Sequence, residues 1–349
     1  MSTGARPAED ARILLIRTSA LGDVVHALPV LTALRRALPR ARLGWVVESG
    51  FAPLLEDHPD LDEILRVDLR SWRKSLFQAS TRHEISKAKS QLRDFRADVA
   101  LDLMGNHKGG ALAWLSGARR RIGLRRADRR EPSSAVWLNE HVVARGRHAV
   151  ERALAVLAPL GVSVDSVDFG GQKILSSTPP EAALWIDTHP EPFAFLHPGA
   201  AWANKRYPPE SWGAAAAALG RSTGLRIVVG AGPGEEELAA CVAANSEGHA
   251  IALSAPSLAF LVTLMRRARI VLGGDTGPLH LARALGTRTV MVMGPTDPAL
   301  HGPYLEPLGS LSHVLPCSYC YKRLPETKSC LLAIPPRQVA EWAVRRLAE

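Results

Sequence analysis

The sequence of 349 residues contains no uninterrupted apolar run of the eighteen or so residues that a helix needs to cross a bilayer. The nearest run, residues 251–265, is broken by polar residues and a proline, which favours a short strand, a turn and an amphipathic helix. Residues 1–11 lack the apolar core of a secretory signal and predict a disordered tail. From these absences we expect a cytoplasmic protein, soluble or peripheral on a membrane.

Cysteine is also scarce. The four cysteines are too few, and lie too late in the chain, for a disulfide scaffold. Cys317, Cys320 and Cys330 have the spacing C-x2-C-x9-C, and His313 is the nearest candidate for a fourth ligand. We expect free or redox-active thiols and no bound metal, with a structural zinc site as the alternative.

Positive charge is abundant and unevenly placed. The chain carries a net charge of +9, and residues 66–152 hold 20 lysines and arginines against 9 acidic residues. This asymmetry predicts an anionic partner, either nucleic acid, anionic lipid or a phosphorylated glycan, and a merely solvated basic surface is the alternative. Seven arginines within residues 119–130 offer forked donors that match phosphate. Because no helix-turn-helix or RNP pattern is present, we expect no nucleic-acid partner.

Short apolar runs alternate with helical patterns. The first half predicts strands at residues 12–17, 43–48 and 98–103. The pattern restarts in the second half, with strands at 193–196, 225–230, 269–273 and 287–293 and helices at 209–219, 235–244 and 278–285. Such alternation predicts doubly wound α/β folding with parallel sheets, and the chain length predicts two domains.

We place the two domains at residues 12–175 and 185–335, with a linker at 176–184 that begins Ser-Ser-Thr-Pro-Pro. Domains of this kind usually bind ligands at the carboxyl ends of their strands. The last helix, residues 336–349, is a candidate to pack back on the first domain.

Asp23 is the first candidate for chemistry, because it follows the first predicted strand by a short glycine-containing turn. A carboxylate at this place can act as a general base that takes a proton from an acceptor hydroxyl. The alternative is a helix cap or a first-turn acid favoured by the helix dipole.

Three turns of the second half are also candidates. Residues 273–280 place Asp275, Thr276 and His280 after a strand, where free backbone N–H groups at a helix start attract phosphate. Lys205 lies in the loop after residues 193–196 and can neutralise a diphosphate leaving group. Residues 230–235 resemble a dinucleotide fingerprint but end in Glu235, which suits ribose hydroxyls better. Ordinary turns, caps and surface cations are the alternatives.

Taken together, these segments make the chain similar to family 9 of the inverting glycosyltransferases, the bacterial heptosyltransferases. The resemblance runs from about residue 13 to 298 and rests on separated motifs in the expected order: RTSALGDVVHALP at 17–29, SWRK at 71–74, REP at 130–132, HAVER at 148–152, HPGAAWANKRYP at 197–208, GAGPGEEE at 230–237, GGDTGPLHLARALG at 273–286 and GPTDP at 294–298.

The resemblance implies the GT-B fold, in which two Rossmann-like domains face each other across a cleft. It implies ADP-heptose as donor, an anionic Kdo2-lipid A acceptor at the cytoplasmic face of the inner membrane, and no cofactor. SWRK, REP and HAVER favour the members that act on the Kdo region of lipid A.

The resemblance also implies residue roles. Asp23 would be the catalytic base and Lys205 would contact the donor phosphates. The expected donor-binding residues are Gly199, Ala200, Lys205, Glu235, Asp275, Thr276, Gly277 and His280. The expected acceptor-binding residues are Ser19, Arg70, Arg73, Lys74, Arg130 and His148.

Two features depart from the family pattern. Gly199 and Ala200 replace hydroxyl-bearing residues, which leaves phosphate contacts there to the backbone. The cysteine segment is more like that of the second heptosyltransferase, so a member acting on another core acceptor is an alternative. A nucleotide-dependent oxidoreductase and a nucleic-acid-binding α/β protein are more distant ones.

Overall fold

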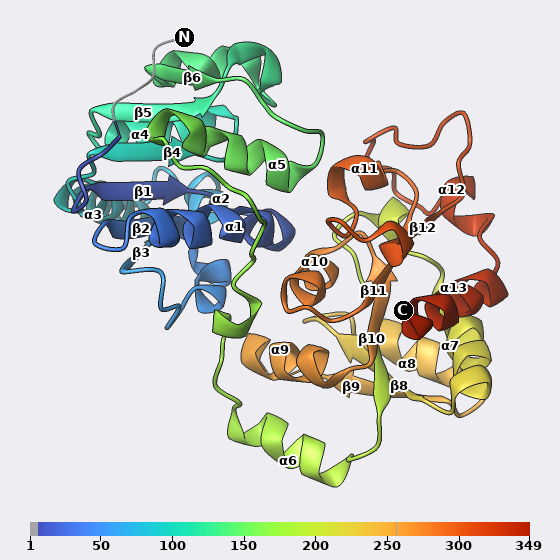
Figure 1. The fold of residues 1–349 in the computed structure, drawn as a ribbon. Coiled ribbons are helices and arrows are strands. Elements are labelled where there is room, and N and C mark those ends of the chain that lie inside the picture. Colours follow the sequence, from blue (N-terminus) through green and yellow to red (C-terminus); the bar gives the residue numbers. More distant parts are fainter. Residues whose placement is uncertain (1–5, 256) are drawn as a thin grey trace. The chain divides into compact units, whose positions relative to one another are not determined.

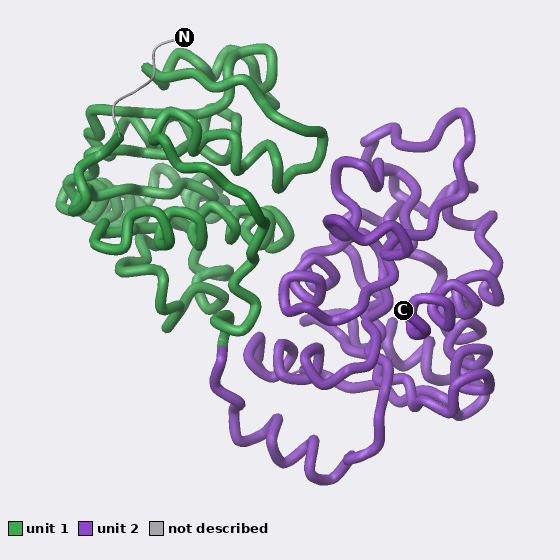
Figure 2. Tube along the Cα trace, viewed as in Figure 1, with its two compact units in different colours: residues 1–175 green, residues 176–349 purple. Residues whose placement is uncertain are grey.

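The computed structural model describes residues 6–255 and 257–349. The chain divides into two compact units between Leu175 and Ser176 (Figures 1 and 2). Each unit contains one parallel sheet of six strands among the described residues. Two sheets of this kind, each with helices in the crossover connections, correspond to the GT-B architecture.

The sheet of the first unit has the order β3-β2-β1-β4-β5-β6. Its strands are β1 (Arg12–Ile16), β2 (Arg42–Glu48), β3 (Glu63–Val67), β4 (Val99–Asp102), β5 (Arg120–Leu124) and β6 (Glu140–Val142). Its helices are α1 (Leu21–Ala37), α2 (Leu69–Trp72), α3 (Ala79–Asp94), α4 (His107–Leu115) and α5 (Ala149–Leu154).

The sheet of the second unit has the order β12-β11-β10-β7-β8-β9. Its strands are β7 (Phe193–His197), β8 (Arg226–Ala231), β9 (Ala250–Ser254), β10 (Ile270–Gly274), β11 (Thr289–Met293) and β12 (Ser310–Ser312). Its helices are α6 (Pro180–Thr188), α7 (Pro209–Thr223), α8 (Glu236–Ala244), α9 (Leu258–Arg267), α10 (Gly277–Ala284), α11 (Pro298–His301), α12 (Ser329–Leu332) and α13 (Pro336–Ala348).

The central strands are apolar because both of their faces are buried. Residues 13–16 of β1 have no exposed surface, and every residue of β7, β10 and β11 is buried. A continuous run of Leu, Ile and Val, rather than an alternating pattern, is what a strand covered on both faces requires. The predictions of β1, β2, β4, β7, β8, β9, β10 and β11 are therefore confirmed.

Four strands were not predicted. β5 begins with Arg120 and Arg121, and β3 with Glu63, so neither shows the apolar run that identifies a central strand. β6 and β12 have three residues each and lie at the sheet edges. Strands this short, or rich in charge, carry little periodic signal.

Part of the expected disordered tail contacts the first unit, and part of the expected linker is helical. Residues 1–5 of the expected disordered tail lie outside the described residues, but Arg6 donates to the carbonyl of Ala37 and Glu9 pairs with Arg40. The expected linker is helical from Pro180 onward, because α6 begins there.

The last helix packs within the second unit, and its packing on the first domain stays a prediction. α13 lies against α7, and its apolar face belongs to the core of the second unit through Val339, Ala340 and Ala343. Its Trp342 donates to the carbonyl of Leu308 at 2.8 Å.

Candidate active site

The candidate residues follow strands at the points where the order of each sheet reverses. In the first sheet the reversal lies between β1 and β4, and in the second between β7 and β10. Asp23 comes after β1, Lys205 after β7 and Asp275 directly after β10. Ligands of doubly wound folds bind outside the carboxyl ends of the strands at such points, because the connecting loops diverge there.

Asp23 lies in the first turn of α1. Its carboxylate accepts a hydrogen bond from the backbone N–H of Ala20 at 3.1 Å and forms an ion pair with Arg17. The guanidinium of Arg17 also donates to the carbonyl of Leu103, beyond β4. Asp23 thus stabilises the start of α1, which is the alternative role predicted for it. Even so, 37% of its side chain stays exposed. The carboxylate is therefore oriented by the protein and still open to a ligand, as a general base must be.

The SWRK segment and Arg70, which precedes it, present three cations to solvent. Trp72 is buried and donates to Glu84 at 2.9 Å, while Arg70, Arg73 and Lys74 are exposed. Within the described part of the chain, no ion pair or side-chain hydrogen bond engages these three cations. The tryptophan anchors the segment, and the cations remain available for an anion.

Glu48, which the sequence did not single out, ends β2 and interacts with Arg70. Burial raises the pKa of Glu48. The negative charge of Asp68 raises this pKa further, whereas the positive charges of Lys108 and Arg70 lower it. A glutamate at the end of an apolar strand, LGWVVE, was the available signal. Glu48 and Lys108 are additional polar groups at this edge of the sheet.

The seven arginines of residues 119–130 do not form one phosphate-binding surface, which corrects that interpretation. Four are held by the protein itself: Arg120 pairs with Glu140 at 2.6 Å, Arg125 pairs with Asp128, Arg129 pairs with Asp102, and Arg121 donates to backbone carbonyls. Arg119, Arg126 and Arg130 are exposed, with no ion pair to any described residue.

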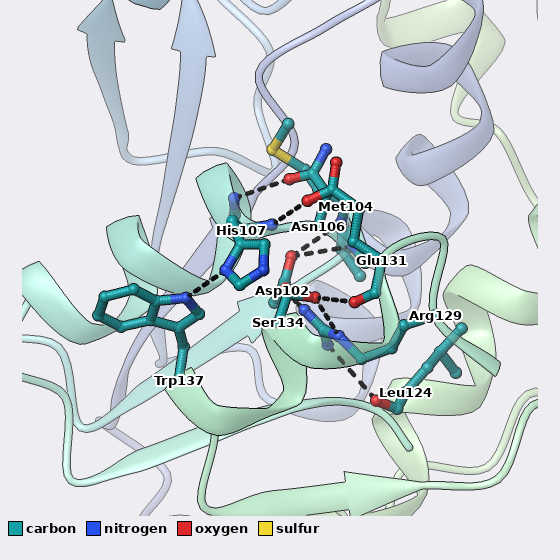
Figure 3. Close-up of polar contacts among 12 residues, drawn as sticks. Asp102, Met104, Asn106, His107, Leu124, Arg129, Glu131, Ser134 and Trp137 are labelled. Atoms are coloured by element: carbon teal, nitrogen blue, oxygen red, sulfur yellow. Dashed lines mark hydrogen bonds and ion pairs between the residues drawn. The ribbon is translucent and has the colours of Figure 1, made fainter. Parts of the chain in front are cut away.

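Arg129 and Asp102 form a fully buried ion pair (Figure 3). Arg129 donates to Asp102 at 2.5 Å and to the hydroxyl of Ser134 at 2.8 Å. The other Asp102 oxygen accepts from the backbone N–H groups of Met104 and Gly105. A Cβ on Gly109 would lie 2.2 Å from this oxygen, so only glycine fits there at the start of α4. The pair fastens the segment after β5 to the carboxyl end of β4.

Arg130 follows directly in the chain and is exposed. Glu131, its neighbour in the REP motif, accepts from the backbone N–H of His107 at 2.8 Å and donates its own N–H to the carbonyl of Gly105 (Figure 3). The glutamate therefore holds the segment on α4, and the arginine is the residue of the motif that can meet a ligand.

His148 and Ser19 differ in their availability. His148 is buried, caps α5 by accepting from the N–H of Val150 at 3.2 Å, and packs edge-on against His26 of α1 with ring centroids 5.3 Å apart. Its place in the HAVER motif thus has a structural explanation. Ser19 is half-buried in the turn before α1.

In the second unit, Asp275 is the centre of a buried polar cluster. Its carboxylate accepts from Lys205 at 2.6 Å, from Thr296 at 2.6 Å and contacts His280 at 3.0 Å. Burial alone would raise the pKa of Asp275, but the hydrogen bonds and charges of His280 and Lys205 hold it well below its usual range. Thr296, from the GPTDP motif, was not predicted as a site residue.

Thr276 and Gly277 begin α10 beside this cluster. The hydroxyl oxygen of Thr276 is buried without a hydrogen-bond partner among the described residues. The first N–H groups of α10 have no partner within the helix, and the helix dipole favours negative charge there. An unpartnered hydroxyl next to a helix N-terminus fits a phosphate oxygen.

Lys205 has a second contact, with an aromatic ring. Its ammonium lies 4.5 Å from the ring centroid of Trp202, and the guanidinium of Arg323 lies 4.8 Å from the same ring. Asn204 donates to the carbonyl of Lys322 at 2.8 Å, which joins this loop to the segment that carries Arg323. Trp202 and Arg323 were not predicted, and the lysine is oriented by both Asp275 and the ring.

Glu235 lies against the loop after β7. A Cβ on Gly199 would lie 2.1 Å from its carboxylate, so glycine is required for this close approach. The buried ring of His197 lies 3.8 Å from Glu235, and burial lowers the pKa of that histidine. Ala200 is buried, and its carbonyl accepts from Arg206 at 2.7 Å.

The three late cysteines are free thiols. Cys317 and Cys320 are exposed and Cys330 is buried, and burial together with the neighbouring cysteines raises the pKa of Cys330. Within residues 6–255 and 257–349, no group of three or more His, Cys, Asp or Glu side chains is placed to hold a metal ion. No helix in these same ranges combines the length and apolarity that a membrane span requires.

Residues 85–330 match the model of glycosyltransferase family 9 (heptosyltransferase). Lipopolysaccharide heptosyltransferase 1 of Pseudomonas aeruginosa is 34% identical over 319 residues, which cover 89% of this chain and 86% of that protein. The protein of the same name from Escherichia coli K12 is 33% identical, over 84% of this chain and 91% of its own length.

Two solved structures agree with these sequences. The E. coli heptosyltransferase WaaC with ADP has a TM-score of 0.80 and 28% identity, and the alignment covers 96% of this chain and 99% of that one. The same enzyme with ADP-2-deoxy-2-fluoro heptose has a TM-score of 0.78.

Proposed function

Since the chain belongs to glycosyltransferase family 9, the heptosyltransferases, and is therefore a glycosyltransferase, we propose that it transfers L-glycero-D-manno-heptose from ADP-heptose to a Kdo hydroxyl of Kdo2-lipid A in lipopolysaccharide inner-core synthesis. The main support for ADP-heptose as donor is the cluster of Lys205, Asp275 and Thr276, which lies where the strand order of the second sheet reverses. The similar enzyme WaaC was solved with ADP and with an ADP-heptose analogue.

The proposed reaction is a single inverting displacement. Asp23 takes the proton of the acceptor hydroxyl, whose oxygen attacks the anomeric carbon of heptose while the bond from that carbon to the ADP oxygen breaks. The negative charge that develops on ADP is stabilised by Lys205 and by the N-terminus of α10 at Thr276 and Gly277. Fixed cations and dipoles at this place supply the charge stabilisation that a divalent metal supplies in other transferases.

Each donor-binding residue is assigned to one part of the donor: the diphosphate, the ribose or the heptose. Lys205 exchanges part of its contact with Asp275 for the diphosphate, and the Thr276 hydroxyl gains the partner that it lacks. Glu235 meets the ribose hydroxyls, while Gly199 and Ala200 contribute backbone. Asp275 and His280 border the heptose.

The acceptor is held by the first unit. Arg70, Arg73, Lys74 and Arg130 are exposed and form no ion pair with a described acid, so they are available for the phosphates and carboxylates of Kdo2-lipid A. Ser19 and His148 are assigned to the acceptor site as well, Ser19 from the turn before α1 and His148 from its buried position at the start of α5. Because the acceptor is a lipid, we place the enzyme peripherally on the cytoplasmic face of the inner membrane.

The direct test incubates purified protein with ADP-heptose and Kdo2-lipid A, with and without EDTA, and reads the product by mass spectrometry. A gain of one heptosyl residue that EDTA leaves unchanged supports donor, acceptor and a metal-independent reaction together. Binding of ADP-heptose without transfer would move the acceptor to another core sugar, and failure to bind ADP-heptose would refute the donor.

A further inference from the structure

Four arginines surround a cavity at the opposite end of the second sheet from Asp275. The cavity measures about 430 Å³ and is lined by residues 266–269 and 285–288. These segments join α9 to β10 and α10 to β11 (Figure 1). Arg269 precedes β10 and Asp275 follows it, so at about 3.3 Å per residue the two lie roughly 20 Å apart. The cavity is therefore separate from the proposed donor site.

The lining of the cavity is strongly basic. Arg266, Arg267, Arg269 and Arg288 contribute to it, and no aspartate or glutamate does. In the part of the chain that the structure describes, Arg267, Arg269 and Arg288 have no ion pair or side-chain hydrogen bond. Arg266 is half-buried, and this burial lowers its pKa. An anion in the cavity would relieve the mutual repulsion of the guanidinium groups.

The helix dipole accounts for the position of only two of these four arginines. Arg266 and Arg267 lie in the last turn of α9, where the helix dipole favours cations. Arg269 and Arg288 each stand just before a strand, where no helix end favours a positive charge. The hydroxyl of Thr287 donates to the carbonyl of Met265 at 2.9 Å and thereby holds the two segments together. The arginines are thus gathered around one space by a fixed connection.

We propose that this cavity binds a phosphate-bearing anion, either the headgroup of an anionic phospholipid or a soluble phosphate. Guanidinium groups offer planar pairs of donors that match two phosphate oxygens at once. A cavity of about 430 Å³ has room for a phosphate group with its attached chemistry. The site goes beyond the proposed function, because neither the donor nor the acceptor residues take part in it.

The test compares the wild type with two cavity variants and one control. The cavity variant is Arg267→Gln/Arg269→Gln. The matched control is Arg337→Gln/Arg345→Gln, which removes the same charge from exposed positions on α13 of the same unit. Each is mixed with phosphatidylcholine vesicles with and without phosphatidylglycerol in a sedimentation assay, and is titrated calorimetrically with inorganic pyrophosphate in saturating ADP. Circular dichroism and thermal melting verify folding, and the single change Arg288→Gln is the second cavity variant.

For a lipid headgroup, we expect the cavity variant to lose binding to phosphatidylglycerol vesicles roughly 30-fold while the α13 control keeps it, since each arginine near an anionic surface contributes about a fivefold factor. For a soluble phosphate, the loss appears with pyrophosphate instead. Equal binding by all four proteins, or no binding of either probe by the wild type, would overturn the proposal. Because heptose transfer is not part of the readout, the result does not depend on the proposed function.

Discussion

At the scale of single residues, Asp23 and Asp275 are two carboxylates with very different surroundings. Both follow a central strand, but the Asp23 side chain is 37% exposed and that of Asp275 only 7%. Asp275 is engaged by Lys205, His280 and Thr296, so its oxygens are already committed to orienting neighbours. Asp23 keeps surface that a substrate hydroxyl can reach.

We expect Asp23→Asn to lower kcat of heptose transfer by roughly 10² to 10⁴, because an amide cannot take the acceptor proton. The amide oxygen can still accept from the N–H of Ala20, so the thermal melting temperature should change little. Steady-state kinetics and a melting curve test this. A variant with near-normal kcat would remove Asp23 from the mechanism.

We expect Asp275→Asn to raise KM for ADP-heptose and to lower stability by roughly 3–5 kcal/mol, the usual cost of leaving a buried partner charge uncompensated. Lys205 would lose the carboxylate that orients it. Thr296→Val is the milder companion, because it removes one hydrogen bond and keeps the charge. Calorimetric ADP binding and chemical denaturation measure both effects, and unchanged donor affinity in Asp275→Asn would contradict the role of the cluster.

At the scale of elements, the segment after β5 contains two adjacent arginines with different surroundings. Arg129 is fully buried against Asp102, whereas Arg130 points away from the core and is exposed. The buried pair ties the segment to β4, and the REP glutamate ties it to α4. The element thus presents Arg130 from a fixed base.

We expect Arg129→Ala to destabilise the first unit by roughly 3–5 kcal/mol, because Asp102 would remain buried without its cation. Arg130→Gln should leave the melting temperature unchanged and raise KM for Kdo2-lipid A without changing KM for ADP-heptose. Denaturation and two-substrate kinetics separate the two outcomes. If Arg130→Gln left the acceptor KM unaltered, Arg130 would not belong to the acceptor site.

The last helix gives a second prediction at this scale. Deleting residues 336–349 should destabilise the second unit, because Val339 is fully buried there and burying one such side chain is worth about 1.5–3 kcal/mol. Hydrogen exchange should show the loss of protection in α7 and β11, which α13 contacts. Loss of protection confined to the first unit would mean that the helix acts elsewhere.

At the scale of the whole molecule, the net charge of +9 is concentrated in the first unit, where the acceptor is proposed to bind. We expect KM for Kdo2-lipid A to rise about tenfold between 0.1 and 1 M salt, since the screening length falls from about 10 to about 3 Å. KM for ADP-heptose should rise less, because Lys205 is largely buried and poorly screened. Equal salt dependence for both substrates would argue against an acceptor site built from surface cations.

Sequence patterns predicted the parts of the fold that depend on local chemistry. The apolar runs of β1, β7, β10 and β11 identify strands buried on both faces, and the restart of the pattern near residue 193 predicts a second sheet. Asp23, Lys205 and Asp275 could be selected because each follows such a strand. The short or charged strands β3, β5, β6 and β12 could not be predicted, since their stability comes from pairing with neighbours.

The sequence alone determined that this chain forms two parallel α/β sheets with acidic and basic residues at the carboxyl ends of their central strands, because strand burial and turn chemistry act over a few neighbouring residues. Only the tertiary structure decided which arginines are structural and which are free, that Thr296 and Trp202 orient the groups around Lys205, and that α13 belongs to the second unit. Those properties depend on contacts between residues far apart in the chain, such as Asp102 with Arg129 and Lys205 with Asp275, and no local pattern encodes such a distance.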